Sequence, residues 1–190
     1  GPYWQLDCEH ALCNAHLLRE LTFVQETTGQ SWPKRMTALL TRAHQRCEAA
    51  RQDHRTALSA RQIRWIFTHY EAILLDAQAR NPHTVRRHKR RGRVKRAPAF
   101  NLQRRLREHT AEVLRFVTDL RVPLTNNLGE RAIRMPKVKQ KISGCFRTLN
   151  GAQNFYTIRS YLDTMHKQGH NLFEVLRLTF MGQAPIPATG

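Results

Sequence analysis

The sequence predicts a mainly α-helical protein whose larger part is an antiparallel helical bundle. Three observations support this prediction: apolar residues recur three or four positions apart along most of the 190-residue chain, capping residues precede several of these runs, and Gly or Pro follows them. Hydrophobic residues make up 41% of the chain, enough for a packed core. No apolar run approaches the roughly 20 residues that span a bilayer.

The first helix is expected at residues 10–28, because its apolar spacing stops at Gly29, a residue type that commonly follows a helix. Ser31 is expected to cap the second helix. Pro33 would then lie in the first turn, where a missing N–H costs nothing. A polar stretch at residues 48–56 either continues this helix or links it to the next.

Two further helices complete the predicted bundle. Ser59 is expected to cap the third helix, which ends at Asn81-Pro82 because a residue before proline disfavours the helical conformation. The fourth helix is expected at residues 99–120 and ends before Pro123. Short turns join these helices, as in an antiparallel bundle.

The pattern changes after Pro123. A short helix is expected at residues 128–134, ended by Pro136. Residues 138–146 alternate loosely in polarity, which suits either one short strand or an extended basic arm. Two more helices are expected. One covers residues 151–167 and is followed by Gly169, and the other begins after Asn171, which is expected to cap it.

Positive charge is the strongest signal in the composition. Lys and Arg number 32 against 14 Asp and Glu, a net charge of +18, and such a balance points to an acidic partner, most often nucleic acid. Twelve Lys or Arg and no acid lie between Arg80 and Arg107. A loop or hairpin tip that contacts the DNA backbone is favoured here over a solvated loop without a ligand. The residues expected to contact DNA are Arg86, Arg87, Lys89, Arg90, Arg91, Arg93, Lys95 and Arg96.

A single carboxylate stands out in a second basic run, since no acid follows Glu130 until Asp163. One interpretation is a surface ion pair with Arg134, one helical turn further on. The other is a carboxylate that holds a divalent cation while the surrounding bases receive phosphates. One Glu does not build such a site alone, so partner carboxylates are needed. The DNA-contact residues predicted here are Asn127, Arg131, Arg134, Lys137, Lys139, Lys141 and Arg147.

Four candidate metal ligands cluster near the start of the chain: Cys8, His10, Cys13 and His16. Thiolate and imidazole ligands of this kind build tetrahedral zinc sites. Zinc sites usually use two ligand pairs separated by a loop, however, and four ligands crowd one helix start. A buried Cys13 and a hydrogen-bonded His16 that pack the helix are therefore favoured over zinc. The four cysteines form no regular disulfide pattern, which indicates a reducing compartment and predicts a cytoplasmic protein.

Several motifs resemble those of the insertion-sequence 66 family of transposases. The N-terminal run from Cys8 to Leu21, Cys-Glu-His-Ala-Leu-Cys-Asn-Ala-His-Leu-Leu-Arg-Glu-Leu, is similar to the family's Cys-x-Ala-His-x-x-Arg segment. Residues 31–120 match the family only in being helical and basic. The resemblance to the C-terminal part of these transposases is carried by Asn126-Asn127-x-x-Glu130-Arg131-Ala132-Ile133-Arg134, Gly144-Cys145-Phe146, Asn150-Gly151-Ala152 and Tyr156-x-x-x-Arg159-Ser160-Tyr161-Leu162-x-Thr164.

This resemblance implies a DDE-type transposase with a ribonuclease-H-like catalytic domain. In that family type, two Asp and one Glu bind two Mg²⁺ ions, cut a phosphodiester with water and join the freed 3′-hydroxyl to target DNA. Carried over by motif, Glu130 would be the third acid and a Mg²⁺ ligand. Both Asp residues are expected on strands before Tyr3, so this chain alone is expected to be inactive. The implied partners are transposon-end and target DNA and further copies of the protein, without a membrane.

The resemblance also implies a domain organisation. Residues 3–122 would be a helical insertion, residues 123–182 the C-terminal part of the catalytic domain with Glu130, and residues 183–190 a frayed tail. Residues 1–2, Gly-Pro, are expected to remain from a cleaved tag. The alternative function is a non-enzymatic helical nucleic-acid-binding module without a metal site, in which Glu130 is a surface carboxylate.

Overall fold

A computed structural model describes residues 5–82 and 96–188 of the chain. These residues are mainly α-helical, and none of those described lies in a strand. The chain divides into two units, Gly1–Asn126 and Asn127–Gly190. No helix in the described part is both long and apolar enough to cross a membrane.

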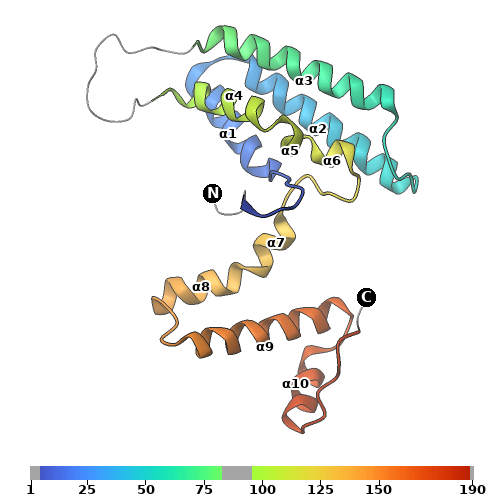
Figure 1. Ribbon diagram of the computed structural model, residues 1–190, viewed down its shortest axis with the longest axis vertical. Helices are drawn as coiled ribbons and strands as arrows, with labels where there is room; N and C mark the ends of the chain where they lie inside the picture. The colour runs from blue at the N-terminus through green and yellow to red at the C-terminus, as the bar shows by residue number, and fades with distance from the viewer. Residues whose placement is uncertain (1–4, 83–95, 189–190) are drawn as a thin grey trace. The chain divides into compact units, whose positions relative to one another are not determined.

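The first unit is a helical bundle, as the apolar spacing predicts. Its first and third long helices each contact both the second and the fourth, so the four close into a ring (Figure 1). Two short helices follow, and the last of them packs against the second long helix. The elements are α1 (Asn14–Thr28), α2 (Ser31–Gln52), α3 (Ala60–Arg80), α4 (Pro98–Glu108), α5 (Thr110–Val113) and α6 (Arg115–Thr118).

The core of this unit is apolar and is drawn from all six helices. Burying each of its large side chains contributes about 1.5–3 kcal/mol relative to leaving that side chain in water. The continuous cluster of buried residues runs from Leu17 to Leu124. Its largest fully buried members are Leu21, Trp32, Met36, Leu40, Ile66, Tyr70, Leu74, Leu102, Leu106, Leu114 and Phe116.

The predicted helix ends are largely confirmed. The Ser59 side chain accepts the backbone N–H of Gln62, whose side chain in turn accepts the N–H of Ser59, so a capping box starts α3. Gly29 follows α1 with a positive φ of 66°. Two starts differ from the prediction: α1 begins at Asn14 rather than at residue 10, and Gln30, not Ser31, is the cap residue of α2.

The single helix expected at residues 99–120 is wrong, because the structure breaks it at His109 and Leu114 into α4, α5 and α6. Four of the five residues from 113 to 117 are buried, a wider arc than one face of a straight helix presents to a core. Partners about 70 residues away satisfy the backbone near the breaks. The Cys47 thiol donates to the carbonyl of Phe116 (3.5 Å), and the Arg51 guanidinium donates to those of Leu120 and Val122 (2.7 and 3.0 Å).

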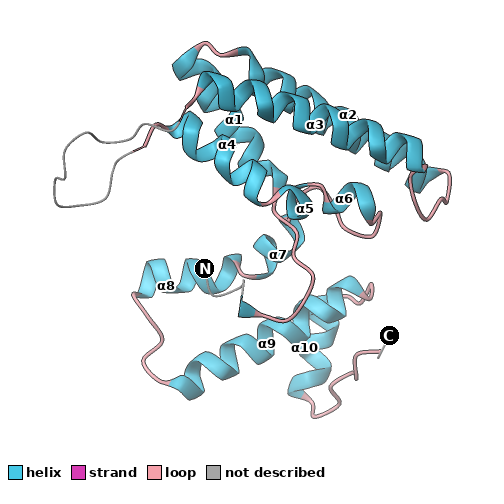
Figure 2. Cartoon of the chain, turned by 45° about the horizontal axis from the view of Figure 1, so that its top comes forward, coloured by secondary structure: helices cyan, strands magenta, loops and turns pink. Residues whose placement is uncertain are grey.

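The second unit corrects the prediction for residues 138–146. They form neither a strand nor an extended arm, since α8 (Arg134–Ser143) covers most of them. Pro136 does not end a helix either. It lies in the first turn of α8, where its missing N–H would have had no partner within the helix. The elements of this unit are α7 (Asn127–Ala132), α8, α9 (Leu149–Lys167) and α10 (Leu172–Phe180) (Figure 2).

The end of the second unit is held by side chains. Gly169 has a φ of 83° just after α9, and the Asn171 side chain accepts the N–H groups of Phe173 and Glu174, as an N-cap does. The tail expected to fray from residue 183 is bonded to α9 and, as far as residue 188, to Gln168, which directly follows α9. The Tyr161 hydroxyl donates to the carbonyl of Pro185 (2.8 Å), and the Gln168 side chain bonds the backbone of Ala188.

Candidate functional site

Glu130 lies on α7 and is exposed to solvent. The break between α7 and α8 is a single residue, Ile133, and the helical hydrogen bonds continue on both sides of it. The N–H of Ile133 donates to the carbonyl of Gly129, and the N–H of Lys137 donates to that of Ile133 (3.2 Å each). The carboxylate therefore lies near the start of a nearly continuous helical segment that reaches Ser143.

The cations of this segment are exposed. Arg134, Lys137 and Lys141 are spaced by three and four residues along α8, so they share one face of the helix. Pro136 is buried and Val138 is half-buried. A row of exposed cations along a helix is disfavoured by their mutual repulsion and suits an anion with repeated charges, such as a phosphate backbone. The predicted DNA-contact residues that are exposed here are Asn127, Arg131, Arg134, Lys137, Lys139, Lys141 and Arg147.

The turn after α8 contains a glycine with a positive φ and an aromatic residue that packs against α9. Gly144 ends the helix with a φ of 74°, a conformation that a side chain disfavours. The ring centroid of Phe146 then lies 5.3 Å from that of Phe155 and 5.9 Å from that of Tyr156 on α9. The N–H of Gly151 donates to the Thr148 hydroxyl at the start of α9 (3.0 Å). These contacts return the chain from α8 to α9.

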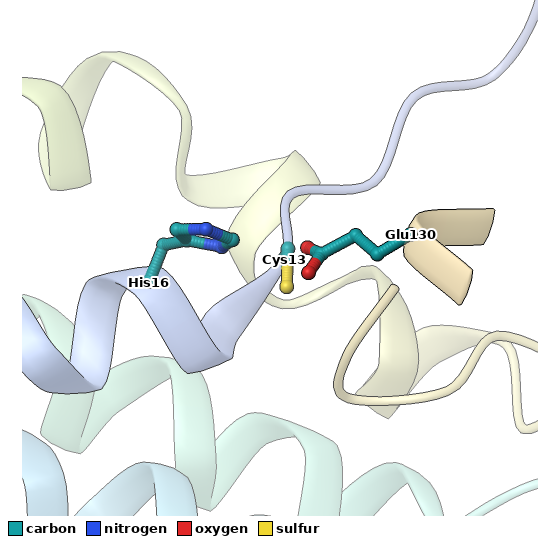
Figure 3. Close-up of side chains that lie close together, drawn as sticks. All are labelled: Cys13, His16 and Glu130. Atoms are coloured by element: carbon teal, nitrogen blue, oxygen red, sulfur yellow. The ribbon is translucent and has the colours of Figure 1, made fainter. Parts of the chain in front are cut away.

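The four predicted zinc ligands are not gathered around one point. Cys8 is exposed in the segment before α1, Cys13 is the cap residue of α1, and His16 lies in its first turn (Figure 3). The sulfur of Cys13 and a ring nitrogen of His16 lie within 4.8 Å of each other. Within the described residues, no third member of the predicted set joins this pair. Zinc binding, the less favoured alternative from the sequence, is untested. The expectation of a buried Cys13 is wrong because its side chain is half-buried.

The start of α1 makes polar contacts that the sequence analysis missed. Asn14 is buried, and its side-chain amide donates to the carbonyl of Val113 (3.0 Å), while its backbone N–H donates to the carbonyl of Leu124 (3.0 Å). The N–H of Asn126 donates to the sulfur of Cys13 (3.3 Å). A signal was present: stepping back from Val24 through Leu21 and Leu17 at helical spacing leads to Asn14, a polar residue on the buried face.

The densest basic tract mostly lies outside the described residues. This holds for the predicted DNA contacts Arg86, Arg87, Lys89, Arg90, Arg91, Arg93 and Lys95. Arg96 is described and exposed, and its guanidinium carbon lies 5.3 Å from the ring centroid of Phe100 on α4. This placement is compatible with a cation–π contact.

The family comparison covers the whole of the first unit and the beginning of the second. A model of the transposase IS66 family matches residues 1–154, which include α1 to α8 and the start of α9. No curated protein and no solved structure matches the chain. The matched range contains the N-terminal Cys-Asn-Ala-His segment, Glu130 and the basic face of α8. The chain therefore belongs to the IS66 family of transposases.

Proposed function

We propose that this chain serves DNA transposition in a DDE-type transposase, with Glu130 as one of three catalytic acids and α7 and α8 as a DNA-contact surface. The observation that carries the proposal is the position of one exposed carboxylate at the head of an exposed, acid-free basic helix, inside the range that matches the transposase family. The family supports action on DNA in general. The roles of individual residues are our inference.

The metal that DDE chemistry uses is compatible with Glu130 as a ligand. Mg²⁺ takes oxygen ligands, and it is commonly bound by one or two carboxylates together with phosphate oxygens and water. Glu130 is exposed, so its carboxylate is accessible to an ion and to a DNA phosphate. A pair of ions needs more carboxylates than one, and two Asp residues of the catalytic domain would complete the set. Bound Mg²⁺ would supply charge stabilisation during phosphodiester cleavage and strand transfer.

The basic residues would act before the chemistry. Arg134, Lys137 and Lys141 on one face of α8 would bind consecutive phosphates and hold the DNA backbone beside the helix of Glu130. Contacts of this kind fix the position of the duplex without reading its sequence. The cations would therefore contribute affinity and register, and Glu130 would contribute the metal site.

The test is Glu130→Gln in the transposase that contains all three acids. The amide keeps the size of the side chain but removes the charge that a metal needs. Mg²⁺-dependent cleavage should fall by on the order of 10²–10³ or more, as when a group that stabilises the transition state is removed. DNA binding should remain. Glu26→Gln is a matched control, because Glu26 is an exposed glutamate on α1.

The alternative function, a non-enzymatic DNA-binding module, rests on the same basic charge of +18. It predicts that Glu130→Gln leaves cleavage by the transposase unchanged. Metal-dependent nicking by the present chain that survives Glu130→Gln would contradict our proposal directly. Loss of cleavage in Glu130→Gln but not in Glu26→Gln would exclude the alternative.

A further inference from the structure

The segments by which the chain enters and leaves the helical bundle are bonded to each other. The entry segment is residues 12–14, at the start of α1, and the exit segment is residues 124–126, directly before α7. Leu124 accepts from the backbone N–H of Asn14 (3.0 Å), and Asn126 donates its N–H to the sulfur of Cys13 (3.3 Å). The second bond joins residues 113 positions apart.

The entry segment is also bonded to the end of α5. The N–H of Leu12 donates to the carbonyl of Glu112, and the Asn14 amide donates to that of Val113 (3.0 Å each). Asn14 is only 1% exposed, so its bond is shielded from water. The entry segment thus has bonded neighbours on two sides, which restricts its movement and that of the exit segment attached to it.

The side chains at the start of α1 do not serve their own helix. Cys13 occupies the cap position, where Ser, Thr, Asp or Asn usually accepts an N–H of the first turn. Its side chain makes no such bond, and its sulfur accepts from Asn126 instead. Asn14, a good capping residue type, lies one position inside the helix and donates to Val113. The side chains of Cys13 and Asn14 therefore bond residues 126 and 113 and do not cap the helix.

We propose that Cys13 and Asn14 are positioning residues for the catalytic carboxylate, an inference that rests on the proposed role of Glu130. The Cys13 sulfur and the backbone N–H of Asn14 hold residues 124–126, the last residues before α7, and Glu130 is the fourth residue of that helix. A catalytic group displaced by about 1 Å loses on the order of 10²-fold in rate. A firm start for α7 therefore matters to the rate more than to DNA affinity.

The first experiment measures amide hydrogen exchange in the present chain. In Cys13→Ala, the amide of Asn126 loses its acceptor and should exchange about tenfold faster or more. Cys13→Ser should restore protection, because a hydroxyl accepts the same N–H. Cys47→Ala is the matched control, because Cys47 is buried and its thiol also bonds a backbone carbonyl, that of Phe116 (3.5 Å). Its loss weakens the core without touching the bonds between residues 12–14 and residues 124–126, which we call the clamp. Unchanged exchange at Asn126 in Cys13→Ala overturns the clamp.

The second experiment measures cleavage by the full transposase. Cys13→Ala should lower kcat about 10- to 100-fold with an unchanged KM for DNA, Cys13→Ser should recover most of the loss, and Cys47→Ala should leave kcat near wild type.

Faster exchange at Asn126 with an unchanged kcat would mean that the clamp is only structural, and it would overturn the positioning role. Full activity of Glu130→Gln removes the proposed function, and the positioning role with it, while the exchange result stands. Stoichiometric zinc in the wild type, with Cys13→Ser as impaired as Cys13→Ala, would assign Cys13 to a metal instead.

Discussion

Tyr70 is a fully buried side chain whose ionisation opposes the folded state. Its hydroxyl donates to the carbonyl of Leu106 (2.8 Å), and burial raises the pKa of Tyr70 well above its ordinary value. Above a pH of about 10, the usual tyrosine pKa, the unfolded chain loses this proton while the folded chain keeps it. Fewer protons on the unfolded state mean that the free energy of unfolding falls as pH rises through this window.

We expect Tyr70→Phe to flatten this pH dependence. The variant should lose about 1 kcal/mol at neutral pH, the usual contribution of one hydrogen bond, because Thr110 also donates to the Leu106 carbonyl and leaves it satisfied. Between pH 9 and 11 its stability should fall less steeply than that of the wild type. Urea unfolding across this range measures both effects, with Tyr156→Phe, an exposed tyrosine, as the control. Equal slopes for wild type and Tyr70→Phe would refute the assignment.

His54 follows α2 in a conformation that suits glycine. Its φ is 56°, and the two hydrogen bonds typical of a helix end, His54 to Arg51 and Arg55 to Ala50 (2.9 and 2.8 Å), close around it. A side chain in this region costs roughly 1–2 kcal/mol, partly offset by the larger freedom of glycine in the unfolded chain. His54→Gly should raise Tm by a few degrees and His54→Ala should not, as thermal unfolding followed by circular dichroism will measure. A lower Tm for the glycine variant would contradict this reading.

The elements that sequence patterns predicted best are those with local end signals. The third helix shows this, because Ser59 and Asn81-Pro82 define its ends through interactions within a few residues. The breaks at His109 and Leu114 have no such local signal. They accompany the burial of residues on a wide arc, and donors from α2, about 70 residues away, bond the carbonyls of Phe116 and Leu120 after the second break. Long-range packing of this kind is invisible to a window of neighbouring residues.

The residues of the candidate site also differ in how well the sequence alone predicted them. Glu130 and the cations of α8 lie in one run of sequence, so charge and motif were enough to single them out. The loose alternation of residues 138–146 nevertheless predicted the wrong element, because Val138 and Ile142, two apolar members of the pattern, are also one helical turn apart. The bond of Cys13 to Asn126 joins residues 113 apart and required the fold.

The basic face of α8 allows a prediction about DNA binding. Replacing Arg134, Lys137 and Lys141 by Gln should lower affinity and reduce the slope of log K against log salt by up to about 2.7, since each phosphate contact contributes about 0.9. The loss should be similar for unrelated DNA sequences, because these contacts read no bases. Fluorescence anisotropy at several salt concentrations measures the slope.

A control of equal charge separates the α8 face from the general charge of the protein. Lys34, Arg61 and Arg64 are exposed cations on α2 and α3, and their replacement by Gln removes the same three charges. We expect this control to change the slope by much less. Equal losses in the two triple variants would mean that the net charge of +18, rather than α8, attracts DNA.

At the scale of the whole molecule, the two units differ in how they bury apolar residues. The continuous core cluster ends at Leu124, inside the first unit. In the second unit the buried apolar residues include Met165 and Val175, but many large apolar side chains are exposed. They include Ile142, Leu149, Ile158, Phe173, Phe180 and Ile186. A small domain that leaves this much apolar surface in water has little net stability of its own.

Truncation at the boundary between the units tests this difference. A chain that ends at Asn126 keeps the whole core cluster and should unfold cooperatively, with a Tm within a few degrees of the full chain. Residues 127–190 alone should show helical circular dichroism without a cooperative transition and should bind a dye that recognises exposed apolar surface. A chain that ends at Arg80 is the control: it lacks Leu102, Leu106, Phe116 and other core residues, and it should not fold. Non-cooperative unfolding of residues 1–126 would show that the bundle depends on α7 to α10 for its stability.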